Sequence, residues 1–190
     1  MIPLILASAS PRRRELLARA GFSFEVLVSE AEENEDPHGD PERMVLENAL
    51  AKARAVAAKR PEALVLGADT TVALENRVFN KPADLTEARE MLRELGGKTH
   101  TVFTGTAFVR AGTGFEETRV VACRVRFRPL DDETISLYFK IVNPLDKAGA
   151  YAVQTGRDLI VESYEEPLSN IVGLPVEIIA PRLKRLTEER

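Results

Sequence analysis

The sequence is poor in side chains that bind soft metals. It contains one cysteine, Cys123, and two histidines, His38 and His100. One cysteine excludes a disulfide within the chain, and so few thiol and imidazole groups argue against a zinc site. We therefore expect any metal cofactor to be a hard divalent cation bound by oxygen atoms, as Mg²⁺ or Mn²⁺ would be.

Long apolar runs and a surplus of positive charge are also missing. No stretch approaches the roughly 20 apolar residues of a membrane-spanning helix, and the N-terminus lacks the basic region and cleavage site of a signal peptide. The 26 lysines and arginines against 30 acidic residues give a net charge of -4, whereas a sequence-independent nucleic-acid binder needs a broad basic face. We expect a cytoplasmic protein whose partners include neither a membrane nor a nucleic acid.

The sequence does have enough apolar residues for a continuous core. Of its 190 residues, 44% are hydrophobic, which fits a single domain over residues 1–190. Helices are predicted where a capping residue or a proline precedes an apolar stripe of helical spacing. The predicted helices cover Pro11 to Ala20, Pro41 to about Arg60, Asp84 to Leu95, Asp131 to Lys140, and a final segment that begins at Pro175.

Strands are predicted where apolar residues run together or alternate between turn residues. Helices and strands are interleaved, yet several strands follow one another directly, which favours antiparallel contacts. We therefore predict a mixed-sheet α/β or α+β fold. The predicted strands are Phe22 to Ser29, Ala63 to Leu66, Val72 to Leu74, Thr99 to Arg110 and Phe115 to Arg128, with a hairpin about Gly156 formed by Gly149 to Gln154 and Asp158 to Ser163.

A polar and basic segment, Ser8 to Arg14, follows the apolar run from Ile2 to Ala7. Ser10 can cap a helix, and Pro11 fits its first position. The free amides at such a helix start, the helix dipole and the guanidinium groups attract phosphate. The segment indicates an anion site, although an ordinary capped helix with a solvated basic flank has the same pattern.

Asp69 is the carboxylate that most suggests chemistry. It comes after an apolar strand and beside Gly67 and Ala68, whose small size leaves room for a ligand, and sites in α/β sheets form at strand ends. An aspartate there can bind a metal or accept a proton from water. The alternative is a turn residue that satisfies local amides. An Asp-x-Asp phosphatase nucleophile is disfavoured, because Thr71 stands where the second carboxylate would be.

Several other polar residues have both a functional and an ordinary explanation. Lys52 lies at the margin of a helical apolar stripe, where lysines usually reach into solvent. Lys81 precedes a proline, which restricts the backbone of the lysine and so gives it a defined direction. The same pair of residues also occurs in ordinary surface loops. Glu32 and Glu33 in an acidic loop are candidate oxygen ligands or solvated charges. Gln154 at a strand end can read a donor and an acceptor on a base edge, or be structural.

Six motifs run along the chain from residue 4 to about residue 176, which is nearly its whole length. They are Ser8-Ala9-Ser10-Pro11-Arg12-Arg13, Glu47-Asn48-Ala49-x-x-Lys52-Ala53, Gly67-Ala68-Asp69-Thr70, Lys81-Pro82, Asp146-Lys147-Ala148-Gly149-Ala150-Tyr151 and Asn170-Ile171-Val172-Gly173-Leu174-Pro175. In this combination and order the motifs resemble the Maf family of nucleoside triphosphate pyrophosphatases. The six together are far more specific than any one of them.

The resemblance implies a fold like that of the inosine triphosphate pyrophosphatases, with an elongated mixed sheet, flanking helices and a cleft between two lobes. It also implies a homodimer. The implied reaction is the attack of water on the α-phosphorus of a nucleotide, which releases a nucleoside monophosphate and pyrophosphate with the help of a divalent cation. By the same resemblance, Asp69 is the proton acceptor, Glu33 and Asp69 help bind the metal, and the triphosphate is held by Ser8, Arg12, Arg13, Lys52 and Lys81.

Within the family, Arg12, Thr70 and Gln154 resemble the subgroup that acts on dTTP and UTP rather than the subgroup that acts on 7-methyl-GTP. The dipeptide Phe79-Asn80, just before Lys81, departs from the usual family pattern. Two alternatives stay open. One is a pyrophosphatase for a purine or a modified nucleotide. The other is a nucleotide-binding regulator of cell division or septum formation, which would bind without turnover.

Overall fold

The computed structural model describes residues 2–188, and in this range seven strands form one mixed sheet. The strands lie in the order β2-β1-β3-β5-β6-β7, with β4 also paired to β3. β1 runs parallel to β2 and β3, and the other pairs are antiparallel, so the predicted mixed fold is confirmed. The strands are β1 (Leu4–Leu6), β2 (Glu25–Val26), β3 (Leu64–Leu74), β4 (Arg77–Phe79), β5 (Thr99–Arg110), β6 (Phe115–Phe127) and β7 (Val161–Tyr164).

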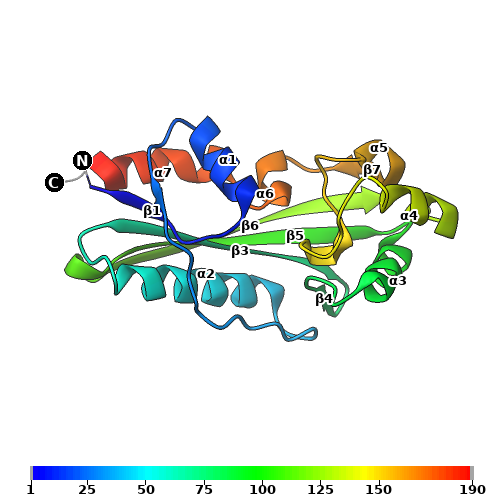
Figure 1. Cartoon of the computed structure of the whole chain (residues 1–190), viewed down its shortest axis with the longest axis horizontal. Coiled ribbons are helices and arrows are strands. Elements are labelled where there is room, and N and C mark those ends of the chain that lie inside the picture. The colour runs from blue at the N-terminus through cyan, green and yellow to red at the C-terminus, as the bar shows by residue number, and fades with distance from the viewer. Residues whose placement is uncertain (1, 189–190) are drawn as a thin grey trace.

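Helices flank this elongated sheet (Figure 1). α2 lies along one side, α1 and α7 lie on the other side at the end where β1 begins, and α3, α4 and α5 gather around the opposite end. Within residues 2–188, none of the helices has the length and hydropathy needed to cross a bilayer. The helices are α1 (Pro11–Arg19), α2 (Pro41–Ala57), α3 (Leu85–Leu95), α4 (Asp132–Tyr138), α5 (Arg157–Ile160), α6 (Leu168–Val172) and α7 (Val176–Glu188), with 3-10 turns at Ala111–Thr113 and Ala148–Ala150.

The helix starts follow from the sequence. Ser10 caps α1 by accepting a hydrogen bond from the amide of Arg13, and Asp40 and Asp84 cap α2 and α3 in the same way. Each cap satisfies an amide that has no partner inside its helix. The predicted starts of these helices are therefore confirmed, and α2 ends at Ala57, slightly before its predicted end.

Three buried clusters form the core, one between α2 and the sheet and one at each end of the sheet. At one end, Leu17 of α1 and Leu183 of α7 pack with β1 and β3. At the other end, Leu92 of α3, Phe127 of β6 and Tyr138 of α4 belong to a second cluster. These clusters form the cores of the two lobes that the resemblance implies, and the middle of β3 lies between them.

α2 lies very close to the sheet because two glycines lie beneath it. A Cβ atom on Gly67 of β3 would lie 2.2 Å from the carbonyl oxygen of Ala49, and one on Gly105 of β5 would lie 2.3 Å from the carbonyl oxygen of Val45. No side chain larger than hydrogen fits between backbones at these distances. The two contacts fix α2 against the middle of β3 and β5.

Two strands, one before α2 and one after it, have other lengths than predicted. The strand predicted from Phe22 to Ser29 is reduced to Glu25–Val26, because its partner β1 is itself short. The chain was also predicted to leave the sheet at Gly67, but β3 continues from Leu64 to Leu74. Pairing with β5 from Val65 to Ala73 supplies the partner that keeps these small and polar residues extended.

The hairpin predicted about Gly156 is also wrong. Residues Arg157–Ile160 are helical, and β7 pairs with β6 instead of with the segment before Gly156. Gly156 itself adopts a left-handed conformation with a φ of 64° and caps α5. Local turn signals identified the glycine correctly, but the pairing partner came from a distant part of the chain.

His100 makes the fold sensitive to acid. Its Nε2 atom lies 2.9 Å from the hydroxyl oxygen of Tyr151, and its Nδ1 atom has no partner among residues 2–188. Burial lowers the pKa of His100 to about 3. Below about pH 6.5 the unfolded chain takes up a proton here, whereas the folded chain does not, so this residue lowers the free energy of unfolding by about 1.4 kcal/mol per pH unit towards pH 3.

We expect His100→Gln to flatten this dependence, because glutamine keeps a polar side chain and does not titrate. Urea unfolding of both proteins at about pH 7, 5 and 4 measures the free energy of unfolding. Since the carboxylates titrate in both proteins, the difference between the two slopes isolates His100. Parallel slopes would show that His100 does not contribute to acid sensitivity.

Candidate active site

The candidate site is built on an open stretch of β3. β5 covers one edge of this strand from Val65 to Ala73. On the other edge, β1 pairs with Leu64–Leu66 and β4 pairs with Val72–Leu74. Between them, from Gly67 to Thr71, no strand of the described chain covers the edge. Asp69 therefore lies in the middle of a strand beside a gap, and the prediction that it follows a strand is wrong.

Asp69 is held by two residues of α2. Its Oδ1 atom lies 2.8 Å from Nζ of Lys52, and its Oδ2 atom accepts a hydrogen bond of 2.9 Å from Nδ2 of Asn48. Asn48 and Lys52 are four residues apart on the helix, so they share the face that meets the strand. The side chain of Asp69 is 11% exposed. Its carboxylate is thus nearly buried and has a fixed direction.

Glu33 brings the acidic loop to the same lysine. Its Oε2 atom lies 2.7 Å from Nζ of Lys52, so Lys52 bridges the carboxylates of Glu33 and Asp69. Asn48 fixes the loop as well, because its Oδ1 atom accepts a hydrogen bond of 2.7 Å from the amide of Asn34. The structure therefore brings together the two carboxylates that were predicted to share a metal.

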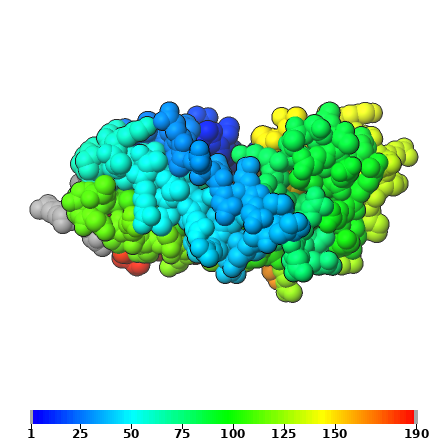
Figure 2. Space-filling model, turned by 90° about the horizontal axis from the view of Figure 1, so that it is seen from below, coloured from blue at the N-terminus to red at the C-terminus, as the bar shows by residue number. Residues whose placement is uncertain are grey.

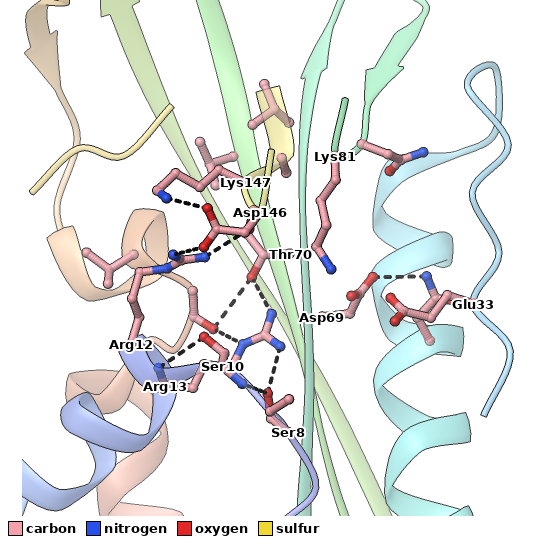
Figure 3. A pocket seen from close by; sticks show the side chains of 18 of the residues that line it. Ser8, Ser10, Arg12, Arg13, Glu33, Asp69, Thr70, Lys81, Asp146 and Lys147 are labelled. Atoms are coloured by element: carbon pink, nitrogen blue, oxygen red, sulfur yellow. Dashed lines mark hydrogen bonds and ion pairs between the residues drawn. The ribbon is translucent and has the colours of Figure 1, made fainter. Parts of the chain in front are cut away.

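Arg13 lies across β3 from this acidic group and is anchored by neutral acceptors (Figure 3). Its guanidinium donates to Oγ1 of Thr70 at 3.0 Å, to the carbonyl oxygen of Gly173 at 2.8 Å and to Oγ of Ser8 at 3.3 Å. Burial is the largest influence on the pKa of Arg13 and lowers it, while the negative charge of Asp69 opposes this effect. Arginine remains charged despite such a shift. Arg13 is therefore a fixed positive charge on this wall.

Arg12 and Lys147 share a carboxylate next to Arg13. Nη1 of Arg12 donates to Oδ2 of Asp146 at 3.1 Å, and Nζ of Lys147 donates to Oδ1 of the same residue at 2.6 Å. Figure 3 shows these groups on the opposite side of β3 from Glu33. Arg12, Arg13 and Lys147 thus bring positive charge to this wall, and Asp146 neutralises part of it.

These walls enclose a cavity of about 510 Å³. In Figure 2 the surface is hollowed between the body that contains α2 and the body that contains α3. Figure 3 shows the side chain of Lys81 pointing into the opening towards Asp69. Among the described residues Lys81 forms no ion pair, so its charge is available to a ligand. Gln154 is exposed and lies at the rim.

Comparison with known proteins identifies the family. A family model described as Maf-like protein matches residues 3–186. The chain belongs to the Maf family. Maf relatives named dTTP/UTP pyrophosphatase include one from Moorella thermoacetica, 49% identical over 176 residues that cover 93% of this chain and 91% of the relative. Another, from Akkermansia muciniphila, is 42% identical over 184 residues that cover 97% of this chain and 96% of the relative.

Residues far apart in this Maf sequence meet in the cavity. Their roles stay predictions, but the structure places every one of them on its walls: Ser8, Arg12, Arg13, Glu33, Lys52, Asp69, Thr70, Lys81 and Gln154. Sequence reasoning quoted Asn48, Asp146 and Lys147 within its motifs but gave them no role, although they also line the cavity. The spacing of Asn48 and Lys52 was a usable signal, because residues four apart on a helix share a face.

The metal hypothesis fits the donors that the structure provides. Within residues 2–188, no group of three or more histidine, cysteine, aspartate or glutamate side chains is placed to hold an ion. Glu33 and Asp69 nevertheless converge on Lys52, and Mg²⁺ is commonly bound by one or two carboxylates together with water and substrate phosphates. The pair therefore fits a divalent cation that binds together with a triphosphate.

Proposed function

We propose that this chain hydrolyses dTTP and UTP to the nucleoside monophosphate and pyrophosphate, and thereby removes these or modified pyrimidine nucleotides from the nucleotide pool. The observation that carries the proposal is the position of Asp69, a nearly buried carboxylate at the gap in β3 that shares one cavity with Arg12, Arg13, Lys52 and Lys81. The names of the relatives support the same substrates.

Asp69 is the proton acceptor in the proposed reaction. Hydrogen bonds from Asn48 and Lys52 to its two oxygen atoms fix the direction of the carboxylate. Each oxygen retains a lone pair, so a water molecule in the gap can donate to it. As the water attacks the α-phosphorus, its proton passes to Asp69, and the bond between that phosphorus and the bridging oxygen of the leaving pyrophosphate breaks.

The cations hold the triphosphate in this proposal. A nucleoside triphosphate carries about four negative charges, and charge grows on the leaving pyrophosphate during the reaction. Lys81 is free to meet it, and Lys52 can exchange part of its contact with Glu33 for a phosphate oxygen. Arg12, Arg13 and the hydroxyl of Ser8 face the same space. These few charges serve an anionic substrate although the protein as a whole is acidic.

Glu33 and Asp69 hold the divalent cation, Mg²⁺ or Mn²⁺, in this proposal. Such an ion, when bound, neutralises phosphate charge and makes the phosphorus easier to attack. Thr70 and Gln154 contact the nucleoside in this proposal, because both line the cavity and Gln154 offers a donor and an acceptor to a pyrimidine edge. We further propose that residues 1–190 act as one domain, in a cytoplasmic homodimer, as the family resemblance implies.

The test is a panel of nucleotides incubated with the purified chain and Mg²⁺ or Mn²⁺. We expect pyrophosphate and monophosphate from dTTP and UTP, and much less from ATP, GTP or 7-methyl-GTP. Release of pyrophosphate from a purine triphosphate instead would show that the proposed pyrimidine substrates are wrong. Binding of dTTP without any product would support the regulatory alternative and refute the proposed activity.

Isotope placement tests the site of attack. In water enriched in ¹⁸O, attack at the α-phosphorus puts the label into the nucleoside monophosphate and leaves pyrophosphate unlabelled. We expect this result by mass spectrometry of the products. Label in pyrophosphate would mean attack at the β-phosphorus, and the placement of Asp69 as the base at the α-phosphorus would then be wrong.

A further inference from the structure

Asp146 contacts two cations of the cavity and was not among the predicted site residues. Its Oδ2 atom accepts a hydrogen bond from Nη1 of Arg12 at 3.1 Å, and its backbone carbonyl accepts another from Nη2 of Arg12 at 3.2 Å. A guanidinium held at two of its nitrogen atoms cannot rotate freely. Asp146 thus determines where the end of the Arg12 side chain lies.

Lys147 completes this arrangement. Its Nζ atom donates to Oδ1 of Asp146 at 2.6 Å and to the carbonyl oxygen of Asn143 at 2.7 Å. The amide of Lys147 also donates to the carbonyl oxygen of Pro144 at 3.2 Å. The side chain of Lys147 is 13% exposed, which is low for a charged group. Lys147 therefore connects the two ends of the segment from Asn143 to Lys147 and holds the carboxylate of Asp146 in the direction of Arg12.

The ion pair itself has limited value for stability. The side chain of Asp146 is 53% exposed, and exposed ion pairs contribute little to folding. Desolvation raises the pKa of Asp146, but the hydrogen bonds from Lys147 and Arg12 outweigh it, and the net shift is downward. The carboxylate is therefore charged at neutral pH. Its main effect is on the orientation of Arg12 in the cavity.

We propose that Asp146, held by Lys147, is a positioning residue that fixes Arg12 for contact with the nucleotide. The inference rests on the proposed function, which makes Arg12 a substrate-binding residue. An arginine side chain has many rotamers, and restricting them before the ligand arrives removes a cost from binding. A site that is already ordered binds more tightly than one that must order itself.

The test combines Asp146→Ala with Arg12→Ala in a double-mutant cycle. In the otherwise unchanged protein we expect Asp146→Ala to raise the KM for dTTP by about 3- to 10-fold, the effect of having to order one long side chain on binding, with a smaller change in kcat. In the Arg12→Ala protein the same substitution should change KM by less than about twofold, because its target is absent. Asp146→Asn keeps an acceptor oxygen and should recover part of the loss.

Two results would overturn the inference. One is an unchanged KM in Asp146→Ala, and the other is an equal loss in both backgrounds, which would mean that Asp146 acts without Arg12. Asp132→Ala is the matched control, because Asp132 pairs with Arg93 at 2.8 Å outside the cavity, and it should leave KM unchanged. Calorimetry with a non-hydrolysable dTTP analogue measures the affinity of the same variants and needs no turnover. If the chain binds the analogue but does not hydrolyse dTTP, the proposed activity is refuted and the role of Asp146 is still tested.

Discussion

Asp69→Asn is expected to lower the kcat for dTTP by about 100- to 10,000-fold, the range over which a general base contributes to a reaction. An amide has nearly the shape of the carboxylate but cannot take the proton of the attacking water. The loss should appear in kcat more than in KM, because proton transfer belongs to the transition state. Steady-state release of pyrophosphate measures both constants.

The fold of this variant should persist. Lys52 keeps an ionic partner in Glu33 at 2.7 Å, so the substitution does not leave Lys52 without a counter-charge. Circular dichroism and thermal unfolding check this point. Asp158→Asn is the control, since the side chain of Asp158 is fully exposed, and it should leave kcat unchanged. If Asp69→Asn retained most of the activity, Asp69 would not be the proton acceptor.

Gly67→Ala should damage both stability and activity. The new methyl group would lie 2.2 Å from the carbonyl oxygen of Ala49 and 3.0 Å from the Cβ atom of Ala53, so α2 must move away from β3. Overpacking of this kind costs about 1–3 kcal/mol. Lys52 lies on the same helix, and a displacement of about 1 Å in a catalytic group lowers turnover on the order of 100-fold.

Denaturant unfolding and kinetics on one preparation measure these two effects together. Gly105→Ala should behave similarly, because its methyl group would lie 2.3 Å from the carbonyl oxygen of Val45. Gly39→Ala is the control: the nearest atom to its methyl group is the mobile end of Met44, at 3.2 Å, which can move aside. Normal activity in Gly67→Ala would show that α2 shifts without carrying Lys52 away from Asp69.

Local signals in the sequence were sufficient for most of the helices. Ser10, Asp40 and Asp84 mark helix starts because their side chains bond to amides within a few residues. Strands depend on partners that are distant in the chain, and there the sequence was less informative. The segment Gly67 to Thr71 has the composition of a turn, yet it is extended because β5 pairs with it. Nothing near that segment encodes this partner.

The candidate site, too, was predictable from the sequence only in part. The motifs named residues such as Asp69, Lys52 and Arg13, and the structure gathers them in one cavity. What the sequence did not reveal is which charges neutralise one another. Lys52 is shared by two carboxylates, and Arg12 is held by Asp146, more than a hundred residues away in the chain. Such pairings depend on how loops and helices are placed in space, and spacing along the chain does not report them.

The gap in the edge of β3 would be an aggregation hazard in a neutral protein. Peptide groups that lack a neighbouring strand can recruit one from another molecule, which is how sheet proteins form intermolecular assemblies. Here β1 and β4 block both ends of the short open stretch, and lysine and arginine side chains surround it. Like charges on two molecules repel each other at such an edge. The cations that would attract a triphosphate therefore also oppose strand pairing between two molecules at this edge.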